Sequence, residues 1–132
     1  MNSRPADQRE LPYREVLRRL SLNDEQLVAA LLAGRIDTAG RAKDGPPILD
    51  QRTRRLVAVA ALIAIDAGEV TVSTAVDNAL AAGAAVEEIV DVLLTVAPSV
   101  GSARVVAMAP KIAASIGYDL SQAFEEAPAG LR

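Results

Sequence analysis

Hydrophobic positions along the chain recur at the three- and four-residue spacing of amphipathic helices. The clearest series follows Gly83 and consists of Val86, Ile89, Val90, Leu93, Leu94 and Ala97. Acidic residues fall between these positions, so they lie on the opposite side of a helix. The segment Thr71–Thr74 favours a strand by composition, but it is short and lies between helical patterns. The pattern therefore predicts an all-α fold.

Capping residues and glycines divide this pattern into about six helices. Asn23 and Gln26 have the spacing of a capping box, and Asp50 is an expected N-cap. Gly34 and Gly68 are expected to follow the ends of helices. The predicted helices span 13–20, 23–33, 50–67, 70–82, 86–97 and 99–116, with one more turn near 122–126.

The run from Leu56 to Ile65 is apolar on nearly every side, which predicts a central helix that is fully enclosed by the others. It is too short to span a bilayer. Pro98 is expected to end or bend its helix, and Pro110 to kink the next one. Residues 1–11 are polar and predict a flexible N-terminal arm, followed by a single all-α domain at 12–132.

The amino-acid composition excludes several kinds of catalytic chemistry and of binding partner. The sequence contains no cysteine and no histidine, so thiol and imidazole chemistry and disulfides are excluded. With a net charge of −3 and three aromatic residues, it lacks the features of a nucleic-acid-binding surface. A core of small aliphatic residues buries little area per side chain, which favours a homo-oligomer. The expected protein is cytoplasmic and needs no cofactor or metal.

Three segments together resemble the carboxymuconolactone decarboxylase and alkyl-hydroperoxidase-D-like superfamily. They are 49–56, with an Asp before a charged turn; 79–89, with Gly83 before a pair of Glu residues; and 92–101, ending in a turn of small residues. The resemblance implies a compact helical fold assembled as trimers or hexamers, with active sites near subunit contacts. It also implies a small organic acid or lactone as ligand.

The chain differs from this family at the positions where family members carry their catalytic residues. The peroxidase-type Cys-x-x-Cys pair and its His correspond to Gly68, Thr71 and Ala75, none of which forms a thiolate or relays a proton. Decarboxylase-type members also place an Arg near Asp77, where the charge here is reversed. The resemblance therefore predicts the fold, and a thiol peroxidase is excluded.

Polar residues in this replaced segment are the candidate site. Glu69 and Asp77 are candidate acid–base catalysts, because a buried carboxylate beside hydroxyl groups can act as a general base. Ser73 and Thr74 adjoin them on a helix, and Arg104 is a candidate clamp for a carboxylate substrate or a partner of Asp77 or Asp91. The structural alternative is that Glu69 stabilises a helix N-terminus and Asp77 faces solvent.

Two further groups of charged residues have competing interpretations. Asp66 lies near a helix C-terminus, where the helix dipole disfavours an anion, so it is expected either to pair with an Arg or to lie at a pocket. Arg52, Arg54 and Arg55 crowd a helix N-terminus and are interpreted as a surface or interface feature rather than an anion site.

Two functions remain open. The first is a lyase or isomerase acting on a small lactone, enol or hydroxy acid by carboxylate acid–base chemistry. The second is a non-catalytic homo-oligomeric protein that binds a small molecule or acts as a scaffold. Burial of Glu69 or Asp77 would favour the first, and exposure of both would favour the second.

Overall fold

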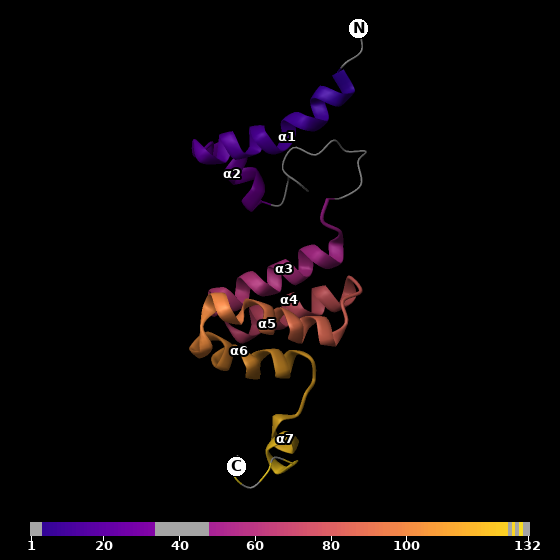
Figure 1. Cartoon of the computed structure of the whole chain (residues 1–132), viewed down its shortest axis with the longest axis vertical. Helices are drawn as coiled ribbons and strands as arrows, with labels where there is room; N and C mark the ends of the chain where they lie inside the picture. Colours follow the sequence, from indigo (N-terminus) through magenta and orange to yellow (C-terminus); the bar gives the residue numbers. More distant parts are fainter. Residues whose placement is uncertain (1–3, 34–47, 127, 129, 131–132) are drawn as a thin grey trace. The chain divides into compact units, whose positions relative to one another are not determined.

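The structure is a computed structural model that describes residues 4–33, 48–126, 128 and 130 (Figure 1). It divides into two compact units, an N-terminal unit at 1–48 and a C-terminal unit at 49–132. All regular structure in the described ranges is helical, which confirms the all-α class. The helices are α1 (Arg4–Ser21), α2 (Glu25–Leu32), α3 (Gln51–Ala64), α4 (Glu69–Ala81), α5 (Val86–Val100), α6 (Ser102–Ser115) and α7 (Leu120–Glu126).

The N-terminal unit is a pair of helices joined by a short turn. α1 begins at Arg4, so residues 4–11 of the predicted arm lie within a helix. The division between the two units falls after Ile48. The single domain at 12–132 stays a prediction.

The residue that caps α2 differs from the sequence prediction. Asp24, rather than Asn23, is the N-cap, and its carboxylate accepts hydrogen bonds from the backbone N–H groups of Gln26 and Leu27. Asn23 instead adopts a positive φ of 53° in the preceding turn, a conformation that Asn tolerates well. The predicted end of this helix at Gly34 lies outside the described residues.

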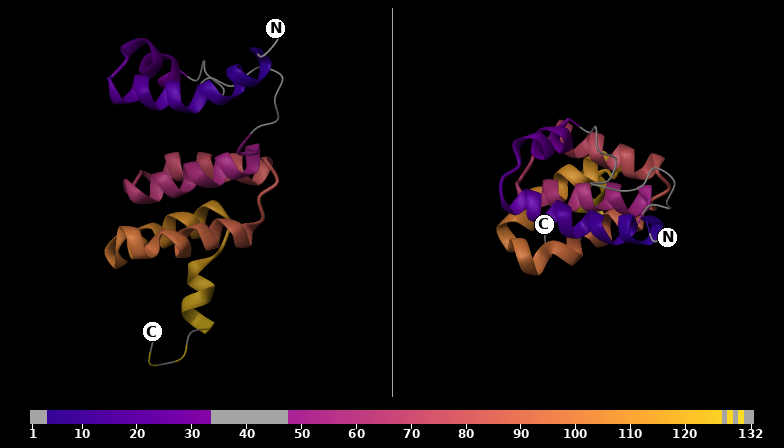
Figure 2. Two further views of the ribbon diagram at one scale, coloured as in Figure 1. Left: turned by 45° about the horizontal axis from the view of Figure 1, so that its top comes forward. Right: turned by 90° about the horizontal axis from the view of Figure 1, so that it is seen from above.

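The C-terminal unit is built around four helices. α3 packs against α4 and α5, and α6 packs against the same two helices from the other side. Figure 2 shows the four as two layers, with α3 beside α4 and α5 beside α6. Their contacts bury one aliphatic core, which consists of Val59, Ile63, Val72, Val76, Ala79, Ala84, Ile89, Leu93, Met108 and Ile112. The composition-based prediction of a core without aromatic side chains is confirmed for the described residues.

The turn between α3 and α4 corrects one glycine assignment. Asp66, not Gly68, occupies the left-handed position after α3, with φ of 54°. The backbone N–H of Asp66 donates to Ile63 O, and that of Ala67 donates to Leu62 O, as expected of a helix that ends in a left-handed residue. Gly68 has an ordinary φ of −65° and is the N-cap of α4.

The junction between α5 and α6 lies three residues later than Pro98 predicts. α5 continues through Pro98 to Val100, because a proline near the end of a helix removes only one backbone hydrogen bond. The break occurs at Gly101, where φ is 87° and ψ is 161°. Only glycine adopts that conformation without strain, so Gly101 rather than Pro98 determines where α6 starts.

α3 is not fully enclosed, contrary to the prediction from its apolar sequence. Val59 and Ile63 are buried, whereas Val57 is 54% exposed and Ile65 is 69% exposed. The helix lies on one side of the core: it contacts α4, α5 and, less extensively, α6, and its remaining face is uncovered within the C-terminal unit. No helix in the described ranges is long and apolar enough to cross a membrane.

Candidate functional site

The four candidate residues of α4 do not form a closed site within the C-terminal unit. Glu69 is the first residue of α4, and both Glu69 and Asp77 are exposed. Ser73 is half-buried. The hydroxyl of Thr74 donates to Val70 O at 2.9 Å, so it satisfies a carbonyl of its own helix. These positions agree with the structural alternative for Glu69 and Asp77.

Arg104 pairs with a residue other than those expected. Its Nη1 lies 4.0 Å from Asp66 Oδ2, instead of near Asp77 or Asp91. Lys111, two turns further along α6, lies 3.3 Å from Asp66 Oδ1. The pairing expected for Asp66 is therefore confirmed, with two cations from α6. Sequence reasoning missed Lys111, although its spacing of seven from Arg104 places both on one face of a helix.

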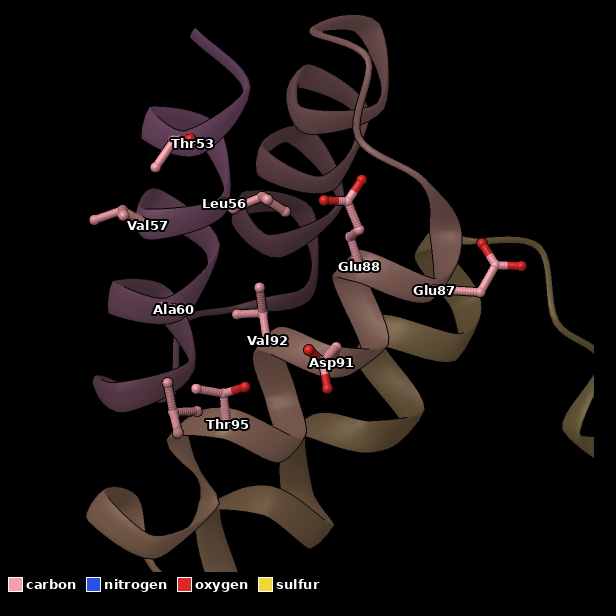
Figure 3. Close-up of a pocket in the computed structure, with 10 residues that line it drawn as sticks. Thr53, Leu56, Val57, Ala60, Glu87, Glu88, Asp91, Val92 and Thr95 are labelled. Atoms are coloured by element: carbon pink, nitrogen blue, oxygen red, sulfur yellow. The ribbon is translucent and has the colours of Figure 1, made fainter. Parts of the chain in front are cut away.

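An open groove of about 600 Å³ lies between α3 and α5 (Figure 3). Its α3 side contains Thr53, Leu56, Val57 and Ala60, and its α5 side contains Glu87, Glu88, Asp91, Val92, Thr95 and Val96. Figure 3 shows Leu56 and Val92 between the two helices, whereas Glu87 points away from α3 at the outer edge. We call this the α3–α5 groove; its floor is aliphatic and its α5 rim is acidic.

Only one of the three rim carboxylates has a partner among the described residues. Glu88 Oε1 accepts a hydrogen bond from Arg52 at 3.1 Å and another from the backbone N–H of Ala85 at 3.0 Å. Arg52 thus links α3 to α5, which supports its interpretation as a structural residue. Glu87 and Asp91 are exposed and make no described ion pair, so the rim carries unbalanced negative charge.

The groove favours apolar groups and disfavours anions. Its floor would gain free energy by covering aliphatic surface, whereas unpaired carboxylates at the rim repel an organic acid. Within the described ranges, no three carboxylates converge as metal ligands. The sequence contains a signal for the groove, since Leu56 and Ala60, like Val92 and Val96, are four residues apart. The pattern alone identifies the acids at 87, 88 and 91 only as a solvent-facing side.

The comparison with protein families decides the affiliation. The model of the carboxymuconolactone decarboxylase family matches residues 29–113, which is more than half of the chain. The chain belongs to the carboxymuconolactone decarboxylase family. Neither the comparison with curated proteins nor that with solved structures finds a match.

In this carboxymuconolactone decarboxylase-family chain, the resemblance assigns the peroxidase thiols and His to Gly68, Thr71 and Ala75, and each of these residues has a structural environment. Gly68 is the N-cap of α4, Thr71 is exposed and Ala75 is half-buried against the core. The α3–α5 groove lies between a different pair of helices. The helical framework expected of the family is thus present, while Gly68, Thr71 and Ala75 respectively cap a helix, face water and pack against the core.

Proposed function

We propose that this family member is a non-catalytic homo-oligomeric scaffold protein, whose apolar surfaces hold copies of the chain together. The observation that carries the proposal is the open α3–α5 groove, an aliphatic floor that nothing in the C-terminal unit covers. Apolar side chains such as Val57 and Ile65 of the α3 segment are also more than half exposed. Contiguous exposed apolar surface on a folded protein is typical of an interaction site.

The surroundings of the two predicted bases support the same proposal. A carboxylate becomes an effective general base near neutral pH when burial or a neighbouring charge alters its affinity for protons. Glu69 and Asp77 are both exposed in the described chain, and neither has a described ion pair. The groove, for its part, presents carboxylates to any ligand, which disfavours a small organic acid there.

The test is the mass of the native protein in solution. We expect light scattering coupled to size-exclusion chromatography to give a multiple of 13.8 kDa at micromolar concentrations. A mass of one chain at every concentration measured would contradict the proposal. A parallel screen against small lactones, enol acids and hydroperoxides should show no turnover, and turnover of any of them would contradict the non-catalytic assignment.

A lyase or isomerase is the second proposal, and the environment of Arg104 favours it. The guanidinium of Arg104 is held only at 4.0 Å from Asp66 and is 37% exposed, so an incoming carboxylate can still reach it. In that mechanism, Arg104 binds the acid group of a small lactone, enol or hydroxy acid. Glu69 or Asp77 moves the proton, and Ser73 and Thr74 contact the substrate.

The second proposal is tested by isosteric replacement. One of the two variants Glu69→Gln and Asp77→Asn should abolish turnover of any substrate found in the screen, because an amide cannot accept the proton. Glu126→Gln, at an exposed position of α7, is the matched control and should have no effect. Unchanged turnover in both α4 variants would exclude these carboxylates as the base.

A further inference from the structure

α1 carries a stripe of exposed apolar side chains. Tyr13 and Leu17 are each 59% exposed, and Leu20 is 39% exposed. Their spacing of four and three residues places them on one face of the helix. We call these three residues the α1 stripe. Such a stripe is the pattern with which a helix binds an apolar groove, with anchors at i, i+4 and i+7.

The α1 stripe is as long as the α3 side of the α3–α5 groove. From Tyr13 to Leu20 the chain advances seven residues, or roughly 10 Å along a helix. The α3 side of the groove, from Thr53 to Ala60, also advances seven residues and has the same rise. The three anchors therefore fit along the aliphatic floor without extending beyond either end.

The charges beside the two surfaces are complementary and equally spaced. Arg14 and Arg18 are four residues apart on α1 and lie beyond Leu17, on the same side of the helix. Glu87 and Asp91 are four residues apart at the rim of the groove, and neither has a described ion pair.

The two arginines can turn towards such a rim. Arg14 contacts only the Tyr13 side chain among the described residues. Arg18 forms an exposed ion pair with Glu15 within one turn of α1. Such a pair contributes little to stability and can be exchanged for another ion pair.

We propose that α1 of a second copy binds in the α3–α5 groove, with the α1 stripe on the aliphatic floor and Arg14 and Arg18 facing Glu87 and Asp91. This inference rests on the proposed homo-oligomeric function and assigns the contact that builds the oligomer. Each copy then supplies one helix and one groove. The contact joins unlike surfaces, so it closes either as a reciprocal pair or as a ring.

Charge reversal tests the contact. The double variant Arg14→Glu/Arg18→Glu reverses the charge beside the α1 stripe. The double variant Glu87→Arg/Asp91→Arg reverses the charge at the rim of the groove. Each double variant alone should dissociate at a concentration at least tenfold higher than the wild type, because like charges then face each other. An equimolar mixture should regain the oligomer, since the acidic helix of one variant matches the basic groove of the other. Glu126→Arg is the control and should assemble as the wild type does.

A disulfide test reports the same contact directly. The chain has no cysteine, so Leu17→Cys and Val57→Cys each introduce a single thiol. Oxidation of the two variants mixed together should give a covalent dimer of twice 13.8 kDa. Leu17→Cys mixed with Val106→Cys, an exposed position of α6 outside the groove, should not.

The outcomes separate the two proposals. A wild-type protein that is monomeric throughout would overturn both the scaffold function and this contact. A wild-type oligomer that both charge-reversal variants leave intact, or that forms no cross-link between the thiols introduced on α1 and α3, would overturn the contact alone. Circular dichroism on each variant confirms that the helices are retained.

Discussion

The ammonium nitrogen of Lys111 lies 3.3 Å from Asp66 Oδ1 and 2.9 Å from the carbonyl oxygen of Ala67. One side chain of α6 thus holds the turn that joins α3 to α4. The Ala67 carbonyl lies in the turn, outside the backbone hydrogen bonds of the two helices. Lys111 therefore supplies a hydrogen-bond donor that the backbone there lacks. α6 therefore stabilises the turn through polar contacts as well as through the core.

Replacing Lys111 should lower the free energy of unfolding. We expect Lys111→Met to cost about 1 kcal/mol, mainly because the Ala67 carbonyl loses its donor, while the exposed ion pair to Asp66 adds little. Urea unfolding followed by circular dichroism measures the change. Lys111→Arg keeps the charge and should lose less, so equal losses in the two variants would contradict this assignment.

The left-handed backbone of Asp66 predicts an order among its variants. Asp66→Gly and Asp66→Ala both remove the contacts with Arg104 and Lys111, but only the alanine retains a Cβ at a φ of 54°. The alanine variant should therefore be less stable than the glycine variant by about 1 kcal/mol. Thermal and urea unfolding of the pair give the difference directly. If alanine were the more stable of the two, Asp66 would not be left-handed in solution.

Two glycines should respond differently to the same substitution. Gly101→Ala should cost about 1–3 kcal/mol, because φ of 87° with ψ of 161° is strained for any residue with a Cβ. Gly68 has φ of −65°, and a Cβ at either position would meet no atom within 4 Å. Gly68→Ala should therefore cost less than Gly101→Ala, about 1 kcal/mol or less, because it adds no backbone strain and only replaces an N-cap glycine with the less favoured alanine. Urea midpoints measured side by side test this, and equal losses would refute it.

Two isoleucines of the α3 segment provide a matched pair for the core. Ile63 is fully buried, and Ile65, directly after the helix, is 69% exposed. Ile63→Ala should cost about 3–4 kcal/mol, because it leaves a cavity in the four-helix core. Ile65→Ala should cost less than about 0.5 kcal/mol in the monomer. Chemical unfolding at low protein concentration tests both, and a large loss for Ile65 would indicate that this face is covered in solution.

The cap of α3 predicts a pH dependence of stability. The backbone N–H of Thr53 donates to Asp50 Oδ1 at 2.7 Å, and this hydrogen bond lowers the pKa of the Asp50 carboxyl from its ordinary value of 3.8. A lowered pKa in the folded state stabilises the fold above the ordinary pKa. That contribution is lost as the pH falls through the lowered value.

Asp50→Asn isolates this contribution, because the amide oxygen still caps the helix but does not titrate. The urea midpoint of the wild type should fall more steeply between about pH 5 and about pH 3 than that of Asp50→Asn. Other carboxylates, Asp24 among them, titrate in both proteins and cancel in the difference. Parallel curves for the two proteins would show that the Asp50 carboxylate makes no ionic contribution.

Local chemistry sufficed to predict several features of this protein. The three- and four-residue periodicity predicted the helices, and Asp50 was correctly predicted as the N-cap of α3. The order of the three family-like segments gave the affiliation that the family match at 29–113 confirms. Each of these features depends on residues that are close to one another in the sequence, so the sequence alone is enough to predict it.

Tertiary structure decided the features that depend on which face of a helix meets another. Leu56 to Ile65 is apolar all round, so its sequence alone cannot show that Val59 faces the core while Val57 lies in a groove. The ion pair between Arg104 and Asp66 likewise depends on tertiary structure. The packing of α6 against α4 brings Arg104 to the turn before α4, where Asp66 lies. The sequence determined the helices, the family and the absence of thiols and imidazoles. The packing of α3 against α5 decided which surface is left open. The residues that pair across these two helices are 30 or more positions apart in the sequence, so the packing depends on the contacts of the whole unit.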